Sequence, residues 1–506
     1  FRYDTQGTYL GSVTLDPVGS RLVLAVKQLE FGSTAVALHD TGTGEYSVRF
    51  YDQFNLLQTV TFADSGTGAF SGLGVFDDAG QPRPLVTFAD VGSQGAEALL
   101  VHSGCQLYYF ADDRSVCFQA YGHYLHWLPI NRPDQFIYFS PGQKPIYFQI
   151  VPEDYWYDQS IENASWWADS FLIIRLGTVQ EIAKYLLDAE VGYIGPNESR
   201  AAEIGIDKSA INPEAIIHYL DYQRAYKTPY EINQLKEANR LAIAGHAAAR
   251  YCFLNGGNEY QIHMTYMEAC NMLEEESPYT NIVALDEKAA ILHYQRKRRD
   301  NSEHSQVLLI DAGCRVNGYG SDVTRTTVKE SAHDSFKSLL AGMEILEQEL
   351  VAMANPGVNY PEIHLAALYK IGQLLIELDI CHGSAEELMK SHVSHLFMPH
   401  GVGHLLGLQV HDVGGHQQSI NGAIKPPPSD TPSLRNTREL SEGMVFTIEP
   451  GCYFIPFLLE PERSQERGKA INWKLVDELY CCGGIRVEDN VLVSEAGVEN
   501  LTRQFE

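Results

Sequence analysis

The pattern of apolar and polar positions divides the chain into three stretches. In residues 1–92, short alternating runs at 46–50 and 58–62 lie between glycine-rich segments at 41–44 and 65–68. Alternation with a period of two and frequent turns predicts a small antiparallel β-rich module. We find no catalytic constellation in this stretch, so a packing or surface-binding role is favoured.

The second stretch has a different rhythm, and a boundary is predicted near residues 92–95. Strand-like apolar runs at 98–101, 136–139 and 191–194 alternate with helical runs, including one at 179–187. This alternation predicts an α/β domain over residues 93–225.

The third stretch, residues 226–506, mixes strands and helices without a regular repeat. Thr228 is a suitable N-cap and Pro229 a suitable first-turn residue for a helix that ends at Asn255 and the glycines after it. Leucine and methionine at helical spacing predict a second helix over 334–353, whose apolar stripe we interpret as core packing. The mixture favours an α+β domain. Three domains also agree with a length of 506 residues at about 150 residues each.

Composition and charge exclude several classes of function. Apolar residues make up 44% and charged residues 20% of the chain, as in ordinary globular proteins. The net charge of −28 argues against nucleic acid and against an anionic membrane as partners. No apolar run is long enough for a transmembrane helix. Nine cysteines without zinc-site spacing predict reduced thiols and a cytoplasmic location.

Two aspartates flank a predicted hairpin. Asn317-Gly318 is typical of a type I′ turn, and with these residues at the turn the numbers of opposed positions sum to 635. Asp311 and Asp322 sum to 633, so they are diagonal neighbours on one face. Two carboxylates so close repel each other unless a cation or a proton lies between them. The alternative is a pair of surface acids, which the apolar run at 307–310 disfavours.

A second cluster consists of His400, His404 and His411, which lie within twelve residues among several glycines. The zincin helix pattern does not apply, because Gly401 occupies the position of its glutamate. A lone histidine is usually structural, but three together favour metal ligation or acid–base chemistry.

Two further clusters place acids at strands. Glu449 follows the apolar run 445–448, and Arg486 and Glu488 lie on one face of another predicted strand. Each of these two clusters alone is weak evidence for a functional site. Together with the hairpin and one histidine they give four carboxylates and one imidazole, which suit Mn²⁺ or Co²⁺ rather than a thiolate-bound zinc. Their charge of about −4 matches two divalent ions, a known hydrolytic arrangement.

From about residue 96 to the C-terminus the chain resembles the bacterial Xaa-Pro dipeptidase (prolidase) family and its relative, organophosphorus acid anhydrolase. The resemblance rests on the four clusters and on segments 98–104, 192–195, 278–285, 291–294 and 472–473. It implies a pita-bread α+β catalytic domain over 226–506, preceded by a creatinase-like α/β domain over 93–225. The β-rich module at 1–92 stands where the family normally has a short helix.

The resemblance also implies a site with two divalent metal ions, for which it favours Mn²⁺. The implied metal ligands are Asp311, Asp322, His404, Glu449 and Glu488. The implied catalytic residues are Glu449, His411, His293 and Arg486. The implied substrate-binding residues are His400, Tyr279, Tyr360 and Leu434, together with Asp113, which lies beside Asp112 on a domain that in family homodimers reaches over the partner's active site.

The activity that follows is hydrolysis of Xaa-Pro dipeptides. Glu449 would take a proton from water and pass it to the leaving nitrogen, and His411 would stabilise the oxyanion. Arg486 and His400 would bind the C-terminal carboxylate of the substrate. Three alternatives stay open: an aminopeptidase P that accepts longer peptides, a pita-bread binding module without catalysis, and a protein whose main binding element is the β-rich module at 1–92 with the hydrolase attached to it. The same metal pair would also allow side activity on organophosphates.

Overall fold

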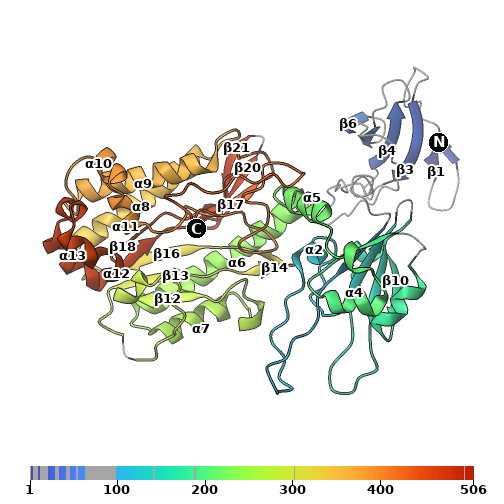
Figure 1. The fold of residues 1–506 in the computed structure, drawn as a ribbon, viewed down its shortest axis with the longest axis horizontal. Helices are drawn as coiled ribbons and strands as arrows, with labels where there is room; N and C mark the ends of the chain where they lie inside the picture. The colour runs from blue at the N-terminus through green and yellow to red at the C-terminus, as the bar shows by residue number, and fades with distance from the viewer. Residues whose placement is uncertain are drawn as a thin grey trace. The chain divides into compact units, whose positions relative to one another are not determined.

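The chain forms two compact units, Phe1–Ile216 and Ile217–Glu506, in a computed structural model (Figure 1). The structure describes residues 98–506 apart from 141–142, 187–189, 301 and 495, and six strands within residues 2–62. In the described part of the chain, no helix combines the length and the apolar character that crossing a membrane requires.

The strands before residue 63 form antiparallel sheets. Four of them pair in the order β3-β4-β5-β6, and β1 pairs with β2. Their bounds are β1 (Arg2–Tyr3), β2 (Tyr9–Gly11), β3 (Arg21–Gln28), β4 (Ser33–Asp40), β5 (Tyr46–Asp52) and β6 (Asn55–Phe62). The two alternating runs seen in the sequence fall in β5 and β6. The predicted turns at 41–44 and 65–68 and the predicted boundary at 92–95 lie outside the described residues.

The rest of the first unit is built on a five-stranded mixed sheet in the order β10-β9-β8-β7-β11. Parallel pairs β7–β11 and β9–β10 flank the antiparallel strand β8. The strands are β7 (Ala98–His102), β8 (Phe136–Phe139), β9 (Ile146–Ile150), β10 (Leu172–Leu176) and β11 (Val191–Ile194), and the helices are α2 (Gly122–Leu125), α3 (Ser165–Ala168) and α4 (Glu198–Ile204). The three predicted strands are confirmed. The helix predicted over 179–187 is a 3₁₀ helix over Val179–Lys184, with a capping box between Thr178 and Glu181.

Helices of the second unit begin and end at the signals in the sequence. In α6, the Thr228 hydroxyl accepts from the Glu231 N–H at 3.4 Å and the Glu231 carboxylate accepts from the Thr228 N–H at 2.8 Å. The helix ends at Asn255, and Gly256 has a φ of +85°. The helices are α5 (Glu214–Arg224), which begins in the first unit, α6 (Pro229–Leu254), α7 (Glu259–Ala269), α8 (Asp334–Met353), α9 (Tyr360–Glu377), α10 (Ala385–Lys390), α11 (Val393–Phe397), α12 (Pro456–Leu459) and α13 (Trp473–Leu479).

The strands of the second unit form two three-stranded and two two-stranded sheets. Their orders are β12-β13-β16, β17-β20-β21, β14-β15 and β18-β19, and every pairing is antiparallel. The strands are β12 (Ile282–Leu285), β13 (Val307–Asp311), β14 (Arg315–Val316), β15 (Tyr319–Gly320), β16 (Thr324–Val328), β17 (Val445–Ile448), β18 (Gly451–Tyr453), β19 (Gly484–Arg486), β20 (Asp489–Ser494) and β21 (Gly497–Asn500).

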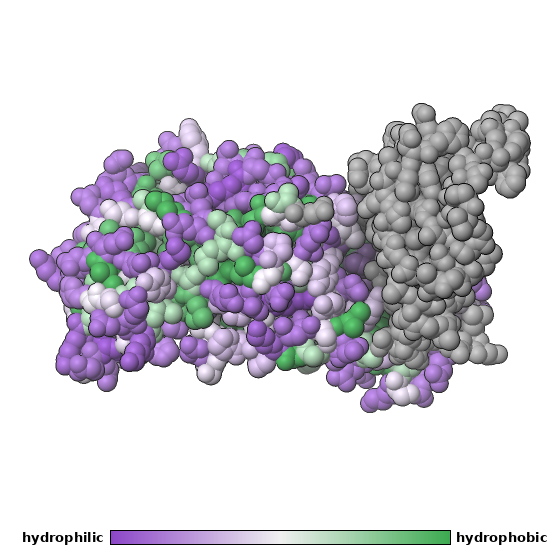
Figure 2. All heavy atoms as spheres, turned by 90° about the horizontal axis from the view of Figure 1, so that it is seen from above, coloured by the Kyte–Doolittle hydropathy of each residue, from purple (hydrophilic) through white to green (hydrophobic). Residues whose placement is uncertain are grey.

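Two helical layers cover these strands. Figure 1 shows α6 and α7 on one side of the strands and α8 and α9 on the other. Apolar side chains of α6 and α7 pack against β12 and β13, and those of α8 and α9 pack against β17, β18 and β20. This arrangement confirms the predicted α+β class. On the face of residues 217–506 that Figure 2 shows, hydrophilic side chains surround smaller apolar areas, as expected for an acidic chain whose core is internal.

Candidate active site

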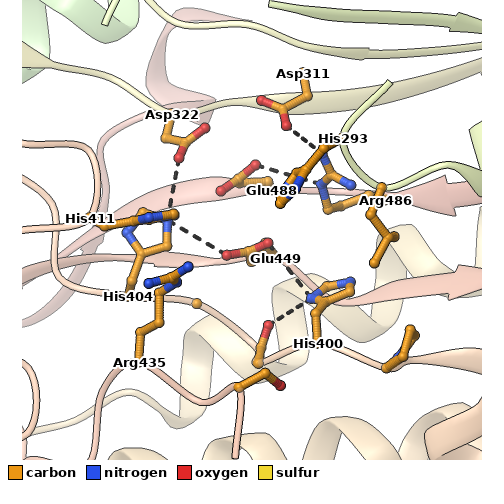
Figure 3. Close-up of a pocket in the computed structure, with 15 residues that line it drawn as sticks. His293, Asp311, Asp322, His400, His404, His411, Arg435, Glu449, Arg486 and Glu488 are labelled. Carbon is orange, nitrogen blue, oxygen red and sulfur yellow. Dashed lines mark hydrogen bonds and ion pairs between the residues drawn. The ribbon is translucent and has the colours of Figure 1, made fainter. Parts of the chain in front are cut away.

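A cavity of about 300 Å³ opens in the second unit, between the two groups of strands (Figure 3). It gathers side chains from distant parts of the sequence. The residues that line it are Leu292, His293, Asp311, Asp322, Pro399, His400, Gly401, Gly403, His404, His411, Ser433, Arg435, Glu449, Arg486 and Glu488. All five side chains expected to bind metal therefore face one space.

The hairpin brings Asp311 and Asp322 together as the sequence predicts. Asn317 and Gly318 have φ angles of +48° and +92°, and Arg315 pairs with Gly320. The same register continues into β13 and β16, where Asp311 pairs with Thr324. Both aspartates are buried. Burial raises the pKa of Asp311, and the charge of the nearby Asp322 carboxylate adds to the effect.

His404 lies between two of the carboxylates. Its Nε2 is 3.3 Å from Asp322 Oδ2 and 3.6 Å from Glu449 Oε1 (Figure 3). The loop that carries it is fixed to the strand before Glu449, because the Thr447 N–H donates to the His404 carbonyl at 2.9 Å and the His404 N–H donates to Thr447 Oγ1 at 3.1 Å. A Cβ on Gly403 would lie 2.2 Å from the Thr447 carbonyl oxygen, so only glycine permits this approach.

Glu488 completes the group from the other side. Thr324 Oγ1 donates to Glu488 Oε2 at 2.6 Å. Ligand atoms of Asp322, His404 and Glu488 lie within 4.8 Å of one another, and all three residues are buried. Such a spacing suits side chains that share one or two cations.

Arg486 lies beside the carboxylates, and each of its three guanidinium nitrogens makes a bond within the protein. Its Nη2 forms an ion pair with Asp311 Oδ2, its Nη1 donates to the Tyr453 hydroxyl at 2.9 Å, and its Nε donates to Thr324 Oγ1 at 3.0 Å. Ile485 and Val487, on the opposite face of the strand, belong to the hydrophobic core, as the alternation predicts. Arg486 therefore acts as a buried counter-charge.

Burial controls the protonation of the acids. It raises the pKa of Glu449 to about 7 and that of Asp311 to about 6, and it raises the pKa of Glu488 well above its usual range, with neighbouring carboxylates adding to the effect. Burial opposes ionisation of Asp322 as well, but the hydrogen bond and the charge of His404 bring the pKa of Asp322 below its ordinary value. Three of the four acids therefore resist ionisation without a counter-charge, and a positive ion would stabilise their ionised forms.

The donor atoms also fit divalent cations. Asp311 Oδ1 is buried, and it accepts no hydrogen bond within the described chain although the Tyr279 hydroxyl lies nearby. Buried acceptors without partners are rare in folded proteins, and a bound cation is one explanation. Asp311, Asp322, His404, Glu449 and Glu488 could hold such ions, because four carboxylates and one imidazole form an oxygen-rich donor set.

The other histidines predicted for the site also line the cavity (Figure 3). The His411 ring lies 4.4 Å from the His404 ring, and burial, followed by the charge of His404, lowers the pKa of His411 to about 4. His400 Nδ1 is 3.8 Å from Glu449 Oε2, and its Nε2 shares a hydrogen bond of 3.0 Å with the Tyr453 hydroxyl. Burial and the charge of Arg486 lower the pKa of His400 to about 3. His293 is exposed at the cavity edge.

The remaining predicted residues lie behind the cavity or away from it. Tyr279 is close to Asp311 and Asp322. The buried Tyr360 hydroxyl donates to the Thr447 carbonyl at 2.7 Å, and Leu434 is buried beside Gly401. Asp113 lies on an exposed loop of the first unit, and its role stays a prediction.

Sequence reasoning missed two residues of the site. Arg435 lines the cavity on an exposed position beside His411. Tyr453 connects Arg486 and His400 through its hydroxyl. Tyr453 follows Glu449 and the turn after it, so the apolar strand pattern around it hid its polar end. Arg435 lies in an irregular loop where no periodicity exists to mark it.

Two parts of the chain match two different protein-family models. Residues 233–495 match the model of metallopeptidase family M24, and residues 89–222 match the model of the Xaa-Pro dipeptidase N-terminal domain. The Xaa-Pro dipeptidase of Pseudoalteromonas atlantica is 39% identical over 419 residues, which cover 81% of this chain and 94% of the relative. The Xaa-Pro dipeptidase of Aeromonas hydrophila is 40% identical over 416 residues, with the same coverage.

Solved structures share the fold. Aminopeptidase P from Escherichia coli with the inhibitor Pro-Leu matches with a TM-score of 0.66 and 22% identity. The matched region covers 81% of the present chain and 91% of the aminopeptidase P chain. The Zn-substituted enzyme in complex with product has a TM-score of 0.65 and 21% identity, with the same coverage. At this identity the likeness concerns the fold alone. The predicted pita-bread architecture and the family resemblance are thereby confirmed, and the chain belongs to metallopeptidase family M24.

Proposed function

We propose that this protein is a dinuclear-metal hydrolase that cleaves Xaa-Pro dipeptides. The observation that carries the proposal is the convergence of four carboxylates and one imidazole on a single cavity in a chain of family M24. Relatives that match 81% of the chain are named Xaa-Pro dipeptidase, which supports a dipeptide substrate. The complete donor set argues against a binding module that has lost catalysis.

The proposed ligands of two divalent ions are Asp311, Asp322, His404, Glu449 and Glu488. We favour Mn²⁺, because hard and borderline ions prefer oxygen-rich donor sets. When bound, the two ions would lower the pKa of a shared water molecule and polarise the scissile carbonyl.

Glu449 is the proposed proton carrier. Its carboxylate faces the cavity 3.6 Å from His404 Nε2. A carboxylate at the cavity wall can accept a proton from water and return it to a leaving group. Glu449 would therefore take the proton from water and deliver it to the proline nitrogen as the peptide bond breaks.

Two other groups would act on the substrate. His411 is neutral at pH 7, since its pKa is lowered to about 4, so one ring nitrogen carries a proton that can be donated to the developing oxyanion. For the substrate carboxylate we propose Arg435 as the main partner in place of Arg486. Arg435 is exposed at the cavity, whereas all three guanidinium nitrogens of Arg486 already bond within the protein.

A carboxylate partner at the cavity favours short substrates over long ones, and this distinguishes a dipeptidase from an aminopeptidase P. The test is a comparison of Ala-Pro, Ala-Pro-Ala and Ala-Ala after chelation and reloading with Mn²⁺, Co²⁺ or Zn²⁺. We expect the highest kcat/KM for Ala-Pro with Mn²⁺. Equal or better cleavage of Ala-Pro-Ala would indicate an aminopeptidase P, and no cleavage by the reloaded protein would indicate a binding module.

We also propose a homodimer and a cytoplasmic location. Two loops of the first unit expose aromatic side chains, with Phe110 fully exposed, Tyr155 85% exposed and Trp156 75% exposed, which supports a contact with a second copy. Asp113 lies on the first of these loops. Nine cysteines without disulfides are compatible with a reducing compartment. Light scattering on the full chain tests the dimer, and a monomeric mass at micromolar concentration would contradict it.

A further inference from the structure

A second group of potential ligands lies in the second unit, outside the cavity. His392 and His395 stand at the start of α11 and within it, and Asp430 lies on the loop that follows residue 424. Their ligand atoms lie within 4.8 Å of one another, and the two imidazole rings have centroids 4.8 Å apart. His364, on α9, lies outside this group of ligand atoms, but it is close enough for its ionisation to be affected by both His395 and Asp430.

Two of these imidazoles, those of His364 and His395, lack partners among the described residues. Both ring nitrogens of His364 and of His395 are buried, and they make no hydrogen bond with any residue that the structure describes. His364 is only 2% exposed. The hydroxyl of Thr431, the residue after Asp430, is also buried and has no partner in the described chain. Buried polar groups without partners are rare in folded proteins, so these four ring nitrogens indicate a ligand.

The imidazoles are also in the form that binds metal. Burial, followed by the charge of His395, lowers the pKa of His364 to about 4. Burial, followed by the charge of His392, lowers the pKa of His395, and the Asp430 carboxylate opposes both effects. Neutral imidazoles have free lone pairs at pH 7, so a metal ion need not displace protons from them.

We propose that His392, His395, Asp430 and His364 form a separate site for one transition-metal ion of the Zn²⁺ class. Three imidazoles and one carboxylate form a nitrogen-rich set that suits tetrahedral Zn²⁺ or Co²⁺, in contrast to the oxygen-rich cavity. Ligand atoms around tetrahedral zinc lie about 3.3 Å apart. His392 and Asp430 are exposed, so their side chains can rotate inward to reach this spacing.

The position of the site suggests what the ion does. His395 precedes His400 by five residues, and Asp430 precedes Arg435 by five residues. The ion would therefore crosslink the two segments that carry His400 and Arg435 into the cavity. Its role is structural, and it holds these side chains in place without contacting the substrate.

The experiment is a Co²⁺ titration of the metal-free full chain, followed by visible absorption and metal analysis. Tetrahedral Co²⁺ absorbs much more strongly than five- or six-coordinate Co²⁺, so the two kinds of site are distinguishable. We expect one strongly absorbing ion per chain in addition to the ions of the cavity. Glu449→Gln should keep this strong band, which separates the proposal from the proposed catalytic centre.

Two conservative variants complete the test. The backbone of His392 has a φ of +57°, and asparagine tolerates this left-handed conformation, so His392→Asn should preserve the fold. Asp430→Asn changes an exposed side chain and should preserve the fold as well. Each should lose the strong band and one equivalent of Co²⁺ or Zn²⁺ while circular dichroism stays that of the wild type. His382→Asn, at an exposed histidine paired with Asp379, is the matched control and should keep both. Unchanged stoichiometry in the two variants, or no strong band in the wild type, overturns the proposal and leaves ordered water as the partner of these nitrogens.

Discussion

Replacement of Asp412 by asparagine should destabilise the second unit strongly. The Asp412 carboxylate pairs with Arg224 through one oxygen and with Lys227 Nζ, at 2.9 Å, through the other, and all three side chains are at most 3% exposed. Burial opposes ionisation of Asp412, but the charges of Arg224 and Lys227 bring its pKa below the ordinary value. The carboxylate therefore stays ionised throughout the neutral range.

The magnitude follows from the two cations that the substitution leaves behind. Asparagine keeps the shape but not the charge, and breaking a buried ion pair costs about 3–5 kcal/mol because a buried charge stays uncompensated. Asp412 also follows His411 directly, and its N–H donates to the carbonyl of Leu405, the residue after His404. This backbone bond survives the substitution, but the two unpaired cations should displace the segment that carries His411, so kcat/KM should fall together with stability.

The assay is urea denaturation at pH 7, followed by circular dichroism and by residual peptidase activity. Glu466→Gln is the control, because its partner Lys469 is 73% exposed and a surface pair contributes about 0–1 kcal/mol. Adding Lys227→Met to Asp412→Asn should recover part of the loss, since one orphaned cation is removed. A loss below about 1 kcal/mol for Asp412→Asn would refute the reasoning. At acidic pH the difference should shrink, because the wild type loses this contribution as the pH falls through the lowered pKa of Asp412.

Three further predictions concern chemistry and pH. Glu449→Gln should lower kcat on Ala-Pro by at least about 100-fold, because the proton carrier is removed, and steady-state kinetics with saturating Mn²⁺ checks this. Arg435→Met should lower kcat/KM for Ala-Pro by about 10- to 150-fold but leave the amide Ala-Pro-NH₂ nearly unaffected, since the amide lacks the charge; an equal loss on both substrates would contradict the role. Burial lowers the pKa of His246 from 6.5 to about 3, so its neutral form, which bonds the Ala312 carbonyl at 3.0 Å, is favoured and stability is lost as the pH falls below 6.5. Between pH 6.5 and 5 the loss of stability amounts to about 2 kcal/mol. The melting temperature of His246→Gln, measured by thermal denaturation, should therefore fall less over that interval than the melting temperature of the wild type.

The parts of the fold that local chemistry dictates could be predicted from the sequence. The Asn317-Gly318 turn fixes the register of the hairpin, so the positions of Asp311 and Asp322 followed from arithmetic on residue numbers. Thr228 and Pro229 determine where α6 begins, and its capping box is present as expected. In these cases the decisive interactions join residues that are close in the sequence.

The parts that depend on distant contacts could not be predicted in the same way. The Arg486 side chain bonds to Asp311, Thr324 and Tyr453. These bonds depend on the packing of β19 against the hairpin, which the periodicity of the sequence does not indicate. The imidazoles of His364 and His395 come from different helices, and in the sequence each looks like an ordinary polar residue. The helix expected over 179–187 is a 3₁₀ helix over Val179–Lys184, and its capping box at Thr178 and Glu181 fixes where it begins but not which helix type it adopts.

The constant register along β13 and β16 limits how this segment can change during evolution. Every pair from Val307 and Val328 to Asp311 and Thr324 obeys one sum, and the same sum holds at the turn. A single residue inserted within either strand would send the side chains on the far side of the insertion from the turn to the opposite face, so that core residues of the strand would leave the core. Homologues should therefore differ here by substitutions, or by insertions and deletions of an even number of residues confined to the turn. Variants with one residue inserted at any position of either strand should be inactive.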